Sequence, residues 1–500
     1  MSKESLTDEA VTNVSWQAML LGSRLILKAV ILIVLARNIP PAEFGLIAAA
    51  TVITSLATDF SQFGVHRALV QRLTLTPAHI RSAFAISLIT GIIAFSGIFI
   101  AAPWFTSFFR MDGVGIFIRF LSLTLLFTGI AAVSASMLQR ERRFRDLGLA
   151  EFGSYLLGFG FVALPMAFAG FGAWALAAGF MTQAVSRTVA VFILHPPAIA
   201  LWPKMAEARE LLRTGIGFSA GQIGNFVATQ VDYVIAGRYL GAEPLGFYNR
   251  AYQFLLLPAQ VFGTVTSTVL FPTLASIQDQ PERVARAYLR TMGVIALLTL
   301  PVGGVLAVIA PELVLFLLGE QWAGMIVPFQ ILVVTLLFRT GYKISDAVTL
   351  ATGSMYARAL RHWIYAAAVA AGAYLGLDYG LAGVAAGVGA AVVLNHVLMM
   401  DLARQVTGIS LSSVALVQLR QVPGAALLIA PLWLAVEMAR AAQLGSLAVL
   451  AIAAATGLAT LAALWLGWRR LFGEEGAWLH DMAAARLARL FRRSRSSATD

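Results

Sequence analysis

The amino-acid sequence predicts an all-α membrane protein of about 14 transmembrane helices, arranged as two pseudo-symmetric six-helix lobes followed by two extra C-terminal helices. Three observations predict this fold class. The composition is strongly apolar, apolar segments long enough to span a bilayer recur along the whole chain, and the two halves contain similar sequences. Nearly all of the chain should therefore lie in the bilayer.

The composition excludes an ordinary soluble protein. Hydrophobic residues make up 59% of the 500 positions and charged residues only 12%, whereas soluble domains have roughly half apolar and about a quarter charged residues. The net charge of +11 does not indicate a nucleic-acid partner, because the basic residues lie mainly in alternate loops, which is the positive-inside pattern of membrane proteins. The chain has no cysteine, which excludes disulfides and thiolate metal sites, and no cofactor is expected.

The alternate loops also give the orientation and the domain boundaries. Their Lys and Arg residues place both termini in the cytoplasm. The first apolar run, 11–36, is too long for a signal peptide and is expected to be an uncleaved span. The predicted organisation is an N-lobe of helices 1 to 6 (1–196), a cytoplasmic linker (197–210), a C-lobe of helices 7 to 12 (211–402), helices 13 and 14 (403–473) and a basic amphipathic cytoplasmic tail (474–500).

The two lobes are predicted from an internal repeat. Segment 36–45 aligns with segment 237–246, which matches the arginine and the final glycine of one copy with those of the other. Each copy follows one predicted span and precedes another, so two related bundles should meet around a central site. This architecture is typical of alternating-access transporters, whose halves rock about a site near the middle of the membrane, and an enzyme does not require it.

Charged residues inside the predicted helices mark the candidate substrate site. A charge at the centre of a bilayer costs roughly 2.5 to 3.5 kcal/mol on insertion scales, so it requires a partner or a function. Arg24 and Lys28 are four residues apart and therefore lie on one face of helix 1. Arg339 and Lys343 repeat this spacing in helix 10, where Asp346 partly neutralises them. Cations between two lobes select an anionic cargo, because the fixed charges replace the water that the anion gives up.

Polar residues extend this predicted cavity. Gln17 precedes Arg24 by seven residues on helix 1. Helix 7 has a continuous polar face made of Gln222, Asn225, Thr229 and Asp232. The repeat alignment places Arg24 on Asn225 and Lys28 on Thr229, so both stripes should line the interface between the lobes.

Some of these residues have a structural alternative. Arg187 either lines the cavity or extends to the cytoplasmic interface, and Arg119 is expected to extend to the opposite interface. Asp232 and Asp346 are candidates for ion coupling or for a gate, and Asp232 has a possible partner in Arg238 or Arg250. Arg24, Lys28 and Arg339 are too far from water for such an alternative, so they are predicted to line the cavity.

A series of runs carries a family resemblance. They are residues 35–45, 63–64 with 68–72, 138–144, 232–241 and 248–252. In these runs the sequence resembles the Wzx-type polysaccharide flippases of the MATE-like exporter superfamily, in particular the branch that exports colanic acid and succinoglycan units. His66 and Arg67 depart from the family pattern, in which small residues are more common.

The resemblance implies a multi-pass protein of the bacterial inner membrane, whose partners are the lipid bilayer and a lipid-linked cargo. That cargo is an undecaprenyl-pyrophosphate-linked oligosaccharide repeat unit, flipped from the cytoplasmic to the periplasmic leaflet for exopolysaccharide or lipopolysaccharide biosynthesis. The resemblance also implies coupling to an ion gradient or membrane potential, and partners among the polymerase and chain-length proteins of the same pathway. It gives Arg24, Lys28 and Arg339 the role of engaging the pyrophosphate and sugar.

Two other functions stay open. A multidrug or small-metabolite cation-coupled antiporter of the same fold needs acidic residues deep in a lobe, and these are scarce here. A membrane polysaccharide polymerase or ligase needs a long outer loop with Arg and His, and the predicted outer loops are short. The sequence contains no nucleotide-binding GxxxxGK[ST] loop, and its six histidines never fall at metal-ligand spacing. A secondary transporter, not an enzyme, is therefore predicted.

Overall fold

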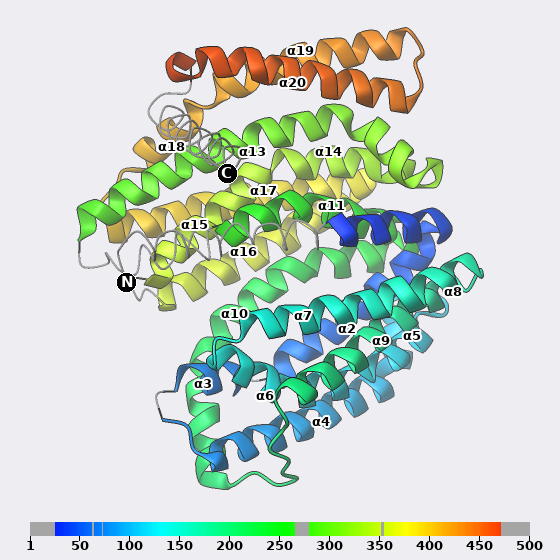
Figure 1. Cartoon of the computed structure of the whole chain (residues 1–500), viewed down its shortest axis with the longest axis vertical. Helices are drawn as coiled ribbons and strands as arrows, with labels where there is room; N and C mark the ends of the chain where they lie inside the picture. The colour runs from blue at the N-terminus through cyan, green and yellow to red at the C-terminus, as the bar shows by residue number, and fades with distance from the viewer. Residues whose placement is uncertain (1–25, 63–64, 73, 266–279, 352–354, 472–500) are drawn as a thin grey trace, which may run out of the picture. The chain divides into compact units, whose positions relative to one another are not determined.

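The structure, a computed structural model, is helical throughout the part of the chain that it describes (Figure 1). The described residues are 26–62, 65–72, 74–265, 280–351 and 355–471. In these ranges nine helical stretches are long and apolar enough to cross a membrane, or ten if the bent pair Glu320–Val334 and Leu336–Thr349 forms one more span. The longest of these stretches, Tyr356–Thr407, contains the two long helices α16 (Met355–Leu375) and α17 (Gly380–Thr407). The all-α membrane fold is confirmed, whereas the count of about 14 spans and the two-lobe layout stay predictions.

The chain divides into two compact units. Unit 1 comprises Met1–Asn249 with Leu317–Gln321, and unit 2 comprises Arg250–Phe316 with Trp322–Asp500. The boundary falls inside helix α11 (Ala242–Val265), so α10 and the start of α11 belong to unit 1. The lobes predicted on either side of the linker 197–210 stay a prediction. The predicted tail, 474–500, lies outside the described residues.

Unit 1 begins with a helix over residues 26–38. The helices that follow are α2 (Pro41–Gln62), α3 (Val65–Gln71), α4 (Pro77–Phe109), α5 (Val114–Ser122), α6 (Thr124–Arg140), α7 (Phe144–Tyr155), a π-helical segment (Leu156–Ala163), α8 (Leu164–Phe168), α9 (Ala173–Leu194) and α10 (Met205–Leu240). Helix α4 packs against α5 and α6, and α10 packs against α2, α3 and α4. Buried apolar side chains of α3, α4, α6 and α10, among them Leu69, Phe84, Val133 and Leu211, form one core. Close packing of these side chains stabilises the bundle through dispersion contacts, because lipid is as apolar as the side chains and leaves no hydrophobic driving force between helices inside a bilayer.

Unit 2 contains the remaining helices. They are α13 (Pro281–Leu318), a short 3-10 helix (Glu320–Met325), α14 (Ile326–Val334), α15 (Leu336–Ala351), α16 (Met355–Leu375), a 3-10 turn (Gly376–Tyr379), α17 (Gly380–Thr407), α18 (Leu411–Leu419), α19 (Val422–Ala441) and α20 (Ser446–Leu471). Helix α17 packs against α14, α15 and α16, and α19 pairs with α20. Leu432, Val436 and Val449 of that pair bury their side chains against Val305 and Ile309 of α13.

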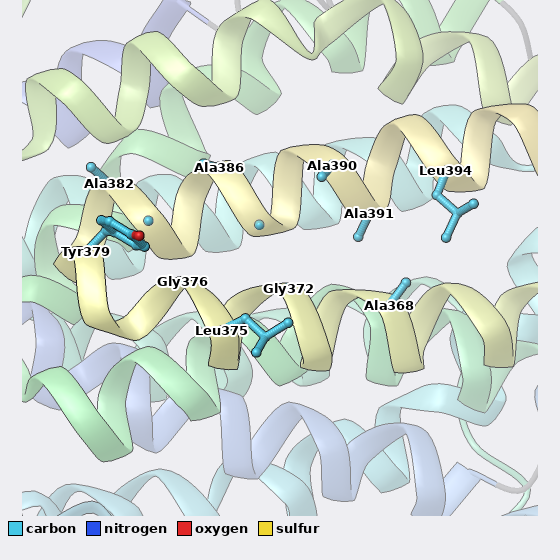
Figure 2. Close-up of a pocket in the computed structure, with 12 residues that line it drawn as sticks. Ala368, Gly372, Leu375, Gly376, Tyr379, Ala382, Ala386, Ala390, Ala391 and Leu394 are labelled. Carbon is cyan, nitrogen blue, oxygen red and sulfur yellow. The ribbon is translucent and has the colours of Figure 1, made fainter.

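Glycines allow α16 and α17 to approach very closely. A Cβ atom on Gly387 would lie 2.0 Å from the carbonyl oxygen of Gly372, and one on Gly383 would lie 2.1 Å from that of Gly376. Only glycine permits such backbone contacts, so these glycines serve helix packing. Small side chains along the same pair, among them Ala386, leave a shallow apolar groove of about 640 Å³ on its surface (Figure 2).

The segment that leads into α10 is fixed to unit 1 by polar contacts. The backbone N–H of Lys204 donates to the Ser82 hydroxyl at 3.0 Å. The Glu210 carboxylate forms ion pairs with Arg72, which follows α3, and with His79 Nε2 at 3.1 Å, at the start of α4. The hydrogen bonds from His79 and Arg72 lower the pKa of Glu210 below its usual value.

The lowered pKa gives a sign to the pH dependence of this contact. Glu210 should stabilise the start of α10 above the ordinary carboxylate pKa, and this contribution should be lost as the pH falls through the depressed value. We expect Glu210→Gln to lower the protection of the amides of residues 205–212 against hydrogen exchange at neutral pH, and acidification of the wild type to lower it as well once the rates are corrected for the pH dependence of intrinsic exchange. Glu207→Gln is the control, because Glu207 forms no described ion pair. Equal exchange in the two variants would contradict the assignment.

Candidate functional site

Arg339 is the most deeply buried cation among the predicted site residues that the structure describes. It lies in the first turn of α15, directly after the bend that separates α14 from α15, and its residue is 3% exposed. Guanidinium groups stay protonated in proteins, so the positive charge is present in the interior. Burying such a charge without a counter-ion is unfavourable, and this residue therefore requires a functional or structural explanation.

Three tyrosines surround the Arg339 guanidinium. Nη1 donates a hydrogen bond to the Tyr252 hydroxyl of α11, and the guanidinium carbon lies 4.5 Å from the centre of the same ring. Tyr342 and Tyr365 interact electrostatically with the guanidinium, and their ring centres are 6.0 Å apart. All three tyrosines are buried. The ring face and hydroxyl oxygen of Tyr252 stabilise the cation, although a neutral tyrosine does not neutralise it. We call Arg339 and these tyrosines the Arg339 cluster.

The hydrogen-bonding capacity of Arg339 is only partly used. Its Nε and Nη2 atoms are buried and have no partner among the described residues. A buried donor without a partner costs about 1 to 3 kcal/mol, more if it is charged. The two free N–H groups of one guanidinium have the geometry that binds the oxygens of a carboxylate or phosphate. The Arg339 cluster is therefore chemically suited to an anion.

Lys343 extends the positive charge along the same face of α15. It is partly buried, and its charge interacts unfavourably with that of Arg339 one turn before. Among the described side chains, no carboxylate lies within ion-pairing distance of either residue. The sequence predicts that Asp346 partly neutralises this stripe. Instead, Asp346 is held by α16, where it pairs with Arg358, at 2.8 Å from Nη2, and with His362 at 3.3 Å.

Two predicted cations of unit 1 occupy more open positions. Lys28 is exposed, and its Nζ lies 5.1 Å from the centre of the Tyr155 ring. Arg187 of α9 is partly buried, and its Nη2 lies 3.4 Å from a carboxylate oxygen of Glu151. Both alternatives for Arg187, cavity lining and extension to the cytoplasmic interface, stay predictions. Arg24 and Gln17 lie outside the described residues.

The polar face predicted for helix 7 lies on α10. Asn225 and Thr229 are partly buried, and Thr229 donates its hydroxyl hydrogen to the Phe226 carbonyl oxygen of its own helix. The side chain of Gln222 lies outside the described part of the chain. Asp232 is fully buried and accepts hydrogen bonds from the Tyr248 hydroxyl at 2.7 Å and from the backbone N–H that follows it.

The two other members of the predicted gate have partners of their own. Arg250 is 4% exposed and donates to the side-chain oxygen of Gln253 at 2.7 Å. Arg238 places its guanidinium 5.4 Å from the centre of the Phe108 ring. Pairing of Asp232 with Arg238 or Arg250 stays a prediction, as does the cavity that the residues of both units should share.

The tyrosines and the ion pairs were not predicted from the sequence. Tyr342 follows Arg339 by three residues and could have been found from helical periodicity. Tyr252 and Tyr365 lie on other helices, and no local pattern connects them with Arg339. The same holds for Arg358, which the sequence marks only as a loop cation.

The chain matches known families and structures. Residues 34–327, more than half of the chain, match the model of the family described as "Polysaccharide biosynthesis protein". The lipopolysaccharide biosynthesis protein WzxC of Escherichia coli (strain K12) is 25% identical over 344 residues, which are 67% of this chain and 68% of that relative. The succinoglycan biosynthesis transport protein ExoT of Rhizobium meliloti (strain 1021) is 28% identical over 311 residues, 62% of this chain and 63% of that relative. The chain thus spans about two thirds of the length of these relatives.

Solved structures show the same fold. The structure titled "Lipid II flippase MurJ, inward closed conformation" superposes with a TM-score of 0.69 at 12% identity, over 90% of this chain and 99% of that one. A multidrug resistance MATE family transporter of the MOP superfamily, in an inward-facing conformation, gives 0.61 at 16% identity, over 79% and 95%. These similarities extend the fold over nearly the whole chain. The chain therefore belongs to the polysaccharide biosynthesis protein family, and its predicted place among the Wzx-type members of the MATE-like superfamily is confirmed.

Proposed function

We propose that the protein moves an undecaprenyl-pyrophosphate-linked oligosaccharide from the cytoplasmic to the periplasmic leaflet of the bacterial inner membrane, for exopolysaccharide or lipopolysaccharide assembly. The observation that carries the proposal is the buried Arg339 guanidinium, which has no acidic partner among the described residues and two N–H groups free to bind an anion. The names of the relatives, a lipopolysaccharide biosynthesis protein and a succinoglycan transport protein, support a cargo of this class.

The proposed mechanism follows from the positive charge of Arg339 and Lys343, which no described carboxylate neutralises. Arg339 and Lys343 would bind the pyrophosphate when alternating access exposes the Arg339 cluster to the cargo, with Arg24 and Lys28 contributing from the N-terminal helix. The anion would satisfy the free donors and neutralise the charge, which lowers the free energy of the loaded state relative to the empty one. Both termini would be cytoplasmic. Asp232, Asp346 and Arg250 are the proposed residues for ion coupling or gating.

A vesicle assay tests this function. The purified protein is reconstituted into liposomes that contain a polyprenyl-pyrophosphate-linked oligosaccharide with a fluorescent sugar label. A membrane-impermeant reductant then destroys only the label in the outer leaflet. We expect protein-free liposomes to lose about half of the signal, because both leaflets are equally populated, and protein-containing liposomes to lose nearly all of it. Protection of the inner half in the presence of folded protein would contradict the proposal, and accompanying transport of cationic dyes would favour an antiporter.

A further inference from the structure

A reciprocal contact joins the two repeat copies within unit 1. The repeat alignment pairs Pro41 with Ala242 and Gly45 with Gly246. A Cβ atom on Gly45 would lie 1.7 Å from the carbonyl oxygen of Ala242, and a Cβ atom on Gly246 would lie 1.9 Å from the carbonyl oxygen of Pro41. Gly45 faces Ala242, and its counterpart Gly246 faces Pro41, the counterpart of Ala242. The two copies therefore make the same contact with each other, as a two-fold crossing of α2 and α11 requires.

Two arginines form a second reciprocal contact beside the glycines. Arg37 of the first copy donates from Nε to the carbonyl oxygen of Leu317, the penultimate residue of α13, at 2.8 Å. The repeat alignment pairs Arg37 with Arg238, whose guanidinium lies 5.4 Å from the ring centre of Phe108, the penultimate residue of α4. Each arginine therefore reaches the end of a long helix of the other copy.

A third contact strengthens the junction on one side. The side-chain amide of Gln321 donates to the carbonyl oxygens of Ala36 at 2.8 Å and Arg37 at 3.3 Å. The segment 317–321 is thereby fixed to the end of the first helix, which accounts for its place in unit 1. Arg37 is exposed, so water can replace its hydrogen bonds when the junction separates.

We propose that Gly45, Gly246, Arg37 and Arg238 form a symmetric latch that closes the periplasmic end of the transport pathway and opens when the cargo leaves. The inference rests on the proposed function for its cargo and on the positive-inside pattern for its side of the membrane. A latch of this kind must close without side chains at its axis, because a Cβ atom essentially never lies within 3.0 Å of another heavy atom. Its flanks consist of hydrogen bonds and a cation–ring contact, which can form and break repeatedly without exposing a large apolar surface.

Distance measurements between spin labels test the latch. The chain contains no cysteine, so Asn38→Cys and Glu243→Cys, both at exposed positions, introduce the only labelling sites. In lipid nanodiscs we expect the wild-type background to show two distance populations. Gly45→Leu or Gly246→Leu should remove the shorter one, and Gly45→Ala should reduce it. Gly97→Leu is the matched control, because a Cβ atom there meets nothing within 4 Å, and it should keep both populations.

The leucine variants add volume and can fail to fold. Arg37→Ala and Arg238→Ala avoid this problem, because they remove latch contacts without adding volume. Both should reduce the shorter population. A single distance that none of the five latch variants changes would overturn the latch. A single short distance in the wild type would overturn it too, since that result indicates static packing. The measurement needs no cargo. A latch that opens in a protein that fails the vesicle assay would leave the opening and closing of these contacts standing, but it would reject the proposed function and, with it, the proposed cargo.

Discussion

Replacing Arg339 by alanine is expected to abolish polysaccharide export while the amount of protein in the membrane stays unchanged. The guanidinium is the deepest described cation of the candidate site, and its free Nε and Nη2 groups are the donors proposed for the pyrophosphate. Loss of one partner from a buried charge pair costs 2 to 5 kcal/mol, which predicts a fall in export on the order of 100-fold. Folding should not suffer, because the replacement removes an unneutralised buried charge and leaves no carboxylate behind.

Export is measured as polymer released per unit of membrane-inserted protein in a strain that depends on this chain. Arg339→Lys should retain part of the activity, because lysine preserves the charge but not the paired donors. Tyr252→Phe should have a smaller effect than Arg339→Ala, because it removes one hydrogen bond and keeps the ring beneath the cation. Arg119→Ala is the control, since Arg119 is an exposed cation near the Phe99 ring. Normal polymer output from Arg339→Ala would remove Arg339 from the substrate site.

The sequence alone was sufficient to select Arg339 as a candidate site residue, because a charge in an apolar run can be recognised from a short segment. A lone arginine in an apolar run is visible without knowledge of the fold, since the bilayer makes its presence costly. Lys343 was found for the same reason, because helical spacing places it on the same face. Tyr252 and Tyr365 of the Arg339 cluster were not found, because they lie on other helices and only tertiary packing brings them near Arg339.

Asp346 illustrates the limit of arguments from a single helix. Its spacing from Lys343 suggested partial neutralisation within α15, yet the carboxylate pairs with Arg358 and His362 of α16. A neighbouring helix can offer a bidentate guanidinium, whose geometry is better than that of a lysine on the same helix. Asp346 therefore forms no described ion pair with Lys343 or Arg339.

Arg140 shows a similar difference in a predicted loop. The sequence counts it only as one of the positive charges that orient the chain. In the structure its Nη1 donates to the carbonyl oxygens of Leu69 at 2.8 Å and Val70 at 3.3 Å, and to that of Arg72 at 2.6 Å. These are carbonyl groups at the C-terminal end of α3, which has no continuing helix to satisfy them. The same residue can therefore set the topology and cap a helix, and only the second role requires coordinates.

Removing the carboxylate of Glu312 is expected to destabilise the attachment of the α19–α20 pair to α13. Glu312 is 7% exposed and receives two hydrogen bonds from Arg440, from Nε at 2.7 Å and from Nη2 at 2.8 Å. The same Nη2 also donates to the Val308 carbonyl oxygen of α13 at 2.9 Å. This is a bidentate pair with one buried partner, and such pairs are considerably stronger than exposed ones.

We expect Glu312→Ala to lower the free energy of unfolding by about 2 kcal/mol, less than the 3 to 5 kcal/mol of a fully buried pair, because Arg440 is 30% exposed and keeps a second carboxylate. That second carboxylate, Glu437, provides the matched control. Its side chain is 43% exposed and contacts Arg440 within one turn of α19, so Glu437→Ala should cost less than about 0.5 kcal/mol. Denaturant unfolding in detergent micelles, followed by tryptophan fluorescence, measures both values. Equal losses in the two variants would mean that solvent screens the Glu312 pair as it screens the Glu437 pair, and that the apolar contacts of Leu432 and Val436 alone hold the C-terminal helices to α13.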